Sequence, residues 1–129
     1  ELNLPFPTAV VLLHREYEAL FLPCIDKMAG QSLETCGIKR PGIVAGTTFS
    51  GNPESIRGVK EWLSRHFPRG HSYKPTTDQL QLTRRIDLAQ LRASGLPCFG
   101  SLERALRFLA ANLGTSGRVY PEVPVPIPA

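Results

Sequence analysis

The pattern of apolar and polar positions changes abruptly near the start of the chain. An unbroken apolar run, Ala9 to Leu13, ends at a charged cluster that contains Glu16 and Glu18. Short runs rich in valine and leucine are typical of buried strands in parallel sheets. We therefore predict one strong buried strand at residues 9–14. The two glutamates would then lie just beyond its carboxyl end, where open α/β sheets usually bind ligands.

Helical spacing predicts most of the other elements. Residues 16–28 predict a helix that kinks or restarts at Pro23, because proline lacks a backbone N–H. Asn52 is a good N-cap and precedes a proline, which predicts a helix that continues to Phe67 and buries Trp62 in the core. Three further helices are expected at residues 77–85, with Leu80 and Leu82 facing inward, at 87–92 capped by Asp87, and from Ser101 to Leu113.

Residues 30–51 have little periodicity, so we expect a long loop there, with a short strand at 42–45 as an alternative. A single strand leaves its backbone groups without partners. Either a weak strand lies within residues 36–50, or the partners belong to another segment or chain. The expected fold class is therefore α/β and mostly helical, within a larger unit. We expect one domain at residues 1–114, incomplete at its N-terminus, and a proline-rich extended tail at residues 115–129.

Composition indicates a soluble globular domain. The chain has 129 residues, of which 42% are hydrophobic and 20% charged, which suits a single core. No apolar stretch approaches the ~18 residues of a membrane span. The three cysteines, Cys24, Cys36 and Cys98, are widely spaced and follow no metal-binding or disulfide pattern. We therefore expect free thiols and a cytoplasmic location.

Charge is distributed unevenly along the chain. Residues 57–92 hold eight lysines and arginines against three acids, whereas residues 1–36 hold five acids against two bases. Such a division suits carboxylates that face a phosphate-binding surface, although an ordinary solvated helix face would give the same run of charge. The candidates for phosphate or nucleic-acid binding are Lys60, His71, Tyr73, Lys74, Arg84 and Arg85.

Several segments also carry a family resemblance, in a fixed order and spacing. They are residues 14–22, 52–63, 73–80, 85–88 and 99–102. Together they resemble the C-terminal half of a bacterial family of unknown function numbered 4276, over residues 4–113. That family is considered TOPRIM-like, a fold whose members hold Mg²⁺ with carboxylates. It is often encoded beside an ATPase, an arrangement associated with defence against phage.

The resemblance implies roles for particular residues. The principal metal ligands of TOPRIM-like proteins match nothing in this chain and would lie upstream of Glu1. The resemblance implies Glu18, Lys74 and Asp78 as catalytic residues, and Glu16 and Glu18 as ligands of Mg²⁺, which prefers hard oxygen donors. The three acidic residues also have a structural alternative. The glutamates are favourable at a helix N-terminus, and Asp78 is a candidate cap of the helix that follows it.

Two functions remain open at this point. The first is the C-terminal part of a Mg²⁺-dependent nuclease that cleaves phosphodiester bonds with an ATPase partner. Its sheet would be completed by the N-terminal half of the domain or by a second chain. The second is a non-catalytic helical interaction module that binds a protein or nucleic-acid partner.

Overall fold

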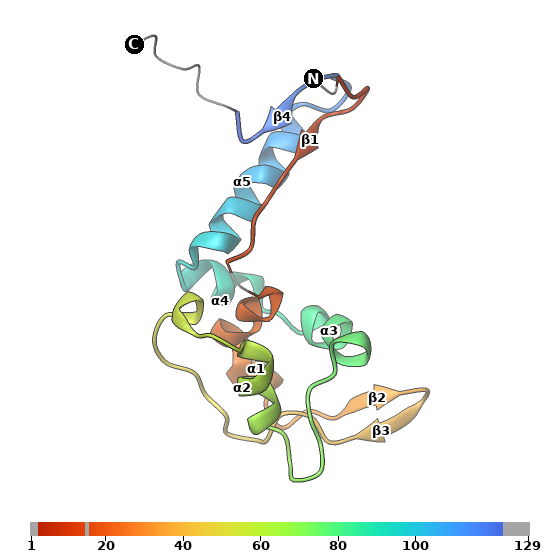
Figure 1. Cartoon of the computed structure of the whole chain (residues 1–129), viewed down its shortest axis with the longest axis vertical. Helices are drawn as coiled ribbons and strands as arrows, with labels where there is room; N and C mark the ends of the chain where they lie inside the picture. The colour runs from red at the N-terminus through yellow and green to blue at the C-terminus, as the bar shows by residue number, and fades with distance from the viewer. Residues whose placement is uncertain (1–2, 15, 123–129) are drawn as a thin grey trace. The chain divides into compact units, whose positions relative to one another are not determined.

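The computed structural model describes residues 3–14 and 16–122 (Figure 1). The chain divides into two compact units. Unit 1 comprises Glu1–Leu12 and Pro97–Ala129, and unit 2 comprises Leu13–Leu96. Helices dominate and the strands are few and short, which confirms the expected α/β, mostly helical class. The predicted boundary at residue 114 falls within unit 1, and residues 123–129 of the predicted tail lie outside the described residues.

Unit 1 is a pair of short strands packed on one long helix. Strand β1 (Thr8–Ala9) pairs in parallel with β4 (Val119–Tyr120), which comes from the segment expected to be an extended tail. Helix α5 (Pro97–Ala111) lies along β1 (Figure 1). It begins four residues before the predicted start at Ser101, since proline is well tolerated in a first helical turn.

The predicted buried strand at residues 9–14 is wrong in extent and in burial. Its regular pairing covers two residues, and two of the apolar residues that follow are exposed, Val10 by 55% and Leu12 by 86%, while Val11 and Leu13 are half-buried. The physical reason lies in the size of the sheet. Among the described residues, the sheet consists of β1 and β4 alone, and α5 packs on one of its faces. The apolar pattern is therefore present without the second layer that would bury it.

The core of unit 2 forms around the segment that follows. A 3-10 helix, η1 (Tyr17–Cys24), continues into α1 (Ile25–Met28), and the change of helix type next to Pro23 confirms the predicted restart. Residues Glu18 to Leu22 are all buried, so η1 lies within the core and has no solvent-facing side there. The other large apolar side chains of this core are Leu33, Ile43, Val59, Leu63, Phe67, Leu82, Leu91 and Leu96.

A β-hairpin interrupts the segment predicted as a loop. Strands β2 (Leu33–Thr35) and β3 (Ile38–Arg40) pair antiparallel, so a strand does lie within residues 36–50, although not at 42–45. Its partner is β2, whereas β1 pairs with β4 from another segment of the chain. Cys36 and Gly37 form the turn, with φ of 51° and 77°. Two positive φ values match a type I′ hairpin turn, which usually carries asparagine or aspartate before the glycine. Because cysteine occupies the first position instead, the sequence pattern did not predict the hairpin.

The helix predicted from Asn52 to Phe67 is in fact two elements. Asn52 accepts a hydrogen bond from the Glu54 N–H (2.9 Å) and caps a 3-10 turn, η2 (Pro53–Ser55). Helix α2 (Val59–Arg65) starts afresh after Gly58, whose φ of 73° is left-handed. A left-handed residue cannot continue a right-handed helix. The prediction of one continuous helix was therefore wrong at Gly58.

The later helices of unit 2 agree better with the sequence. Helix α3 (Pro75–Arg84) and helix α4 (Leu88–Ala93) lie close to their predicted positions. Asp87 caps α4 by accepting a hydrogen bond from the Gln90 N–H (3.0 Å). Leu82 is buried as expected, but Leu80 is 59% exposed, so the prediction that it faces inward is wrong.

Candidate functional site

Glu18 lies at the centre of the network that the sequence singled out. Its side chain is 1% exposed within η1. Oε1 accepts hydrogen bonds from the Tyr73 hydroxyl (2.9 Å) and from the Gln79 amide (3.0 Å). Burial raises the pKa of the Tyr73 phenol, and its hydrogen bond to Glu18 raises that pKa further. A buried carboxylate is tolerated where donors replace lost water, and here both donors come from residues 73–79.

Asp78 forms a second buried carboxylate beside the first. It is fully buried in the first turn of α3, where Oδ2 accepts from the Lys74 backbone N–H (2.8 Å) and Oδ1 from the Thr77 hydroxyl (3.0 Å). Oδ1 also forms an ion pair with the guanidinium of Arg40, which is 18% exposed at the end of β3. Asp78 therefore joins the base of the hairpin to the start of α3. The alternative that it caps this helix is the one that the geometry supports.

Arg40 itself is held by two further hydroxyl groups. Its Nε donates to Thr35 Oγ1 (2.7 Å) and an Nη donates to Thr77 Oγ1 (3.3 Å). Arg40 was not among the predicted site residues, because its partner Asp78 is far away in sequence and the segment between 30 and 51 was expected to be a loop. Only the hairpin brings the two charges together.

Glu16 has a different role from Glu18. Its carboxylate oxygens accept hydrogen bonds from the backbone N–H groups of Val59 (3.2 Å) and Lys60 (3.1 Å). These are orphan donors of the first turn of α2, whose N-cap, Gly58, has no side chain to receive them. The structure thus gives the two glutamates separate partners, and it does not bring their oxygens together at one point.

The residues present do not fit a bound Mg²⁺ ion. No group of three or more histidine, cysteine or acidic side chains arranged to hold a metal occurs within residues 3–14 and 16–122. Both oxygens of Asp78 already accept from protein donors, and an ion there would have to displace Arg40. Mg²⁺ needs oxygen ligands that are free to coordinate it. In this chain the carboxylates hold the fold together.

The predicted phosphate-binding residues are mostly at the surface. Lys60, His71, Lys74 and Arg84 are exposed, and Arg85 is half-buried with Nη2 donating to the Ser32 carbonyl (2.7 Å). Tyr73 is buried, so neither face of its ring is available to a base. Two members of this set take part in the carboxylate network, Tyr73 through its hydroxyl and Lys74 through its backbone N–H.

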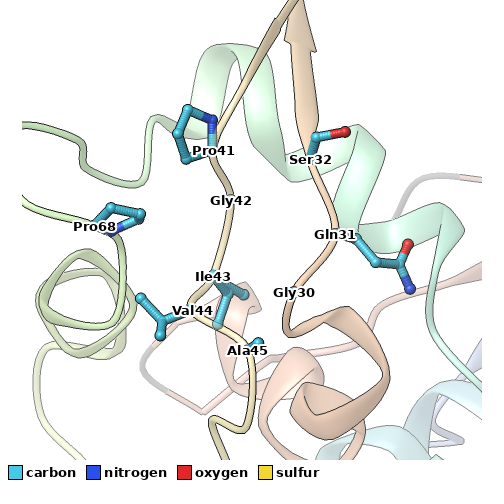
Figure 2. Close-up of a pocket in the computed structure, with 9 residues that line it drawn as sticks. All are labelled: Gly30, Gln31, Ser32, Pro41, Gly42, Ile43, Val44, Ala45 and Pro68. Carbon is cyan, nitrogen blue, oxygen red and sulfur yellow. The ribbon is translucent and has the colours of Figure 1, made fainter.

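A separate hollow of about 330 Å³ lies on unit 2 (Figure 2). Two stretches of backbone, residues 30–32 and 41–45, form most of its wall together with Pro68. In Figure 2 the side chain of Gln31 points away from the hollow. Gly42 lies so close to the Gln31 carbonyl oxygen that an added Cβ would be 2.4 Å from it. None of the predicted site residues lines this hollow.

These features define an α/β protein in which two buried carboxylates, Glu18 and Asp78, each have protein partners. The chain matches the family model described as "Domain of unknown function (DUF4276)" over residues 3–107, and it belongs to that family. No curated protein and no solved structure matches the chain. None of the helices in the described part of the chain combines the length and apolar character needed to cross a membrane.

Proposed function

We propose that this chain is a non-catalytic interaction module whose unit 1 binds a partner protein that completes its sheet. The observation that carries the proposal is the uncovered face of the sheet. Side chains alternate along a strand, so Val10 shares a face with Thr8. Val119, the register partner of Thr8, lies on the same face. Val10 is 55% exposed and Val119 44%. Parallel sheets are almost always covered on both faces.

The opposite face of this sheet is covered within unit 1. Tyr120, the register partner of Ala9, packs its ring on Phe108 of α5, with ring centroids 5.6 Å apart. Among the described residues, one face of the sheet therefore has its helix, whereas on the other Val10 and Val119 are exposed and only the Thr8 hydroxyl is buried. A hollow of about 370 Å³ beside the exposed stretch is lined by Val10, Val11, Leu12, Ser101, Tyr120 and Pro121.

One edge of the sheet is open as well. The N–H groups of Thr8 and Val10 donate to Arg118 (3.0 Å) and Tyr120 (2.9 Å) of the β4 segment. The backbone of Ala9 therefore points to the other side, where the described sheet has no third strand. Main-chain groups at such an edge pair readily with an added strand. We propose the N-terminal half of the domain, or a second chain, as the source of that strand.

Co-expression with the polypeptide encoded immediately upstream in the same genome tests this proposal. We expect the two to co-purify, and Leu12→Lys to weaken the complex at least about tenfold, because a charge would enter an apolar interface. Leu80→Lys is the matched control, since Leu80 is an exposed leucine of unit 2. Sedimentation velocity of the chain alone would detect self-association, which would show that the partner is a second copy of the chain. A strict monomer with no co-purifying partner would contradict the proposal.

The Mg²⁺-dependent nuclease is a second candidate. In its favour, the acidic network and the exposed side chain of Lys74 adjoin, as the family resemblance implies. Lys74 would then supply a positive charge to a phosphate, and the metal ligands would come from outside the described residues. Plasmid cleavage with Mg²⁺, with and without an ATPase partner, tests this candidate. Loss of cleavage in Lys74→Ala, in a variant that remains folded, would support it, and no cleavage by the wild type under any of these conditions would exclude it.

We also propose a cytoplasmic location. Its support is that Cys24, which is buried, and Cys36, which is exposed, are both free thiols. Unpaired cysteines are usual in reducing compartments.

A further inference from the structure

Three aromatic rings gather at α2, apart from the network around Glu18. The ring of His66 stacks on the indole of Trp62, with centroids 3.9 Å apart and an angle of 30° between the planes. Phe49 meets the same indole edge-on, with centroids 5.6 Å apart. All three side chains are only partly buried, so the prediction that Trp62 lies in the core is wrong. Trp62 is instead partly accessible on α2.

The backbone fixes the orientation of the histidine ring. Nδ1 of His66 lies 2.7 Å from the carbonyl oxygen of Trp62. A carbonyl oxygen can only accept, so Nδ1 carries the proton and donates. The imidazole is therefore held against the indole before any ligand arrives. A preorganised surface of this kind loses little entropy on binding.

Positive charge surrounds the rings. Arg57, Lys60, Arg65 and Arg69 are all exposed, and Glu61 is the one acid between residues 57 and 71. Arg65 follows Trp62 by three positions in α2, a spacing that puts two side chains on neighbouring parts of a helix surface. Arg69 follows in the turn after the helix. Flat rings with cations beside them suit a ligand that has both π-faces and phosphates.

We propose that Phe49, Trp62 and His66 form a stacking platform for the bases of single-stranded nucleic acid. Arg65 and Arg69 would hold the phosphates on either side of the stacked base. Duplex bases are already stacked on one another and present only their edges, so the platform selects unpaired strands. This site lies wholly within unit 2 and is independent of the partner proposed for unit 1.

Trp62 is the only tryptophan of the chain, so its fluorescence reports directly on the site. We expect an oligodeoxythymidine of about 12 nucleotides, a common site size for such surfaces, to quench this fluorescence in a saturable way. A duplex of equal length and inorganic polyphosphate should leave it unquenched, because neither offers an unpaired base. Equal quenching by the duplex or by polyphosphate, or no quenching at all, would overturn the proposal.

Variants test whether the aromatic rings contribute to binding. With a fluorescein-labelled oligodeoxythymidine, we expect His66→Ala and Phe49→Leu each to weaken binding about tenfold or more, as base–aromatic contacts do elsewhere. Lys39→Ala is the control, because Lys39 is an exposed cation on the hairpin. It should change the affinity by less than about threefold, because the variant loses only one positive charge that is distant from the rings. Circular dichroism checks that each variant is folded. If folded His66→Ala and Phe49→Leu bind as tightly as the wild type, the platform does not exist.

Discussion

At the scale of the residue, a carboxylate can be buried only where donors replace the water that it loses. Glu18 receives two donors and Asp78 three, counting the guanidinium of Arg40. These contacts tie η1, the hairpin and α3 to one another. The carboxylates are therefore needed for stability whether or not the protein has any catalytic activity.

Asp78→Asn should lower the free energy of unfolding by about 3 kcal/mol, because breaking a buried ion pair leaves Arg40 without its counter-charge. We place the value at the low end of the usual range because Arg40 is 18% exposed and reaches some water. Urea denaturation measures the change. Glu61→Gln, at an exposed helical position, should change stability by less than about 0.5 kcal/mol. Equal stability of Asp78→Asn and the wild type would show that the pair contributes nothing.

Tyr73 should ionise only well above the ordinary phenol pKa of 10.0, because burial and the Glu18 carboxylate both raise its pKa. The folded state therefore favours the neutral phenol. Its stabilising contribution is complete below pH 10 and is lost as the pH rises through the raised pKa. The absorbance difference between wild type and Tyr73→Phe during an alkaline titration isolates this group. A phenolate signal at the ordinary pKa in folded protein would contradict the network.

The site could be predicted only in part from these residues. The motif around residues 73–79 was identified, and capping by Asp78 was one of its two interpretations. The burial of Tyr73 and the pairing of Asp78 with Arg40 were not accessible, because both depend on where the hairpin lies in three dimensions. No periodicity in the sequence encodes a contact between residues 38 positions apart.

At the scale of the element, the side-chain amide of Gln81 pairs with the backbone of β2. The Gln81 amide of α3 accepts from the Glu34 N–H (2.8 Å) and donates to the Glu34 carbonyl (2.8 Å). It also donates to the Thr77 carbonyl in its own helix (2.7 Å). The amide thus pairs with β2 as a neighbouring strand would, and it holds the hairpin on α3.

Gln81→Leu should therefore loosen the hairpin locally. We expect the Glu34 amide to exchange with solvent at least about tenfold faster, since local opening governs such exchange. Amides in α4 should keep their protection, because the hydrogen bonds of the Gln81 amide go to Glu34 and Thr77 and not to that helix. Hydrogen exchange followed by NMR resolves the two regions. Unchanged exchange at Glu34 would mean that the hairpin is held by its other contacts alone.

The elements with good caps were the ones that the sequence predicted well. Asn52 and Asp87 begin their helices where expected, since an N-cap acts through its own neighbours. The hairpin and the break at Gly58 were missed, because each depends on a positive φ. Glycine permits that conformation without requiring it.

At the scale of the whole molecule, the two units differ in completeness. Unit 2 has a closed apolar core that contains most of the buried side chains. The described residues of unit 1 form one helix and two strands, with exposed apolar residues on the sheet. Three or more strands, or a second layer, are usually needed for a stable sheet. This contrast is the reason that we place partner binding on unit 1.

The most direct test of the account concerns the metal. Thermal unfolding of the chain should give the same midpoint with and without about 10 mM Mg²⁺ at equal ionic strength, because the carboxylates already have protein partners. If the folded protein bound Mg²⁺, a free Mg²⁺ concentration one hundred times the dissociation constant would raise the free energy of unfolding by about 2.7 kcal/mol. The account predicts no such rise. A Mg²⁺-dependent rise in the midpoint that disappears in Glu18→Gln would contradict it.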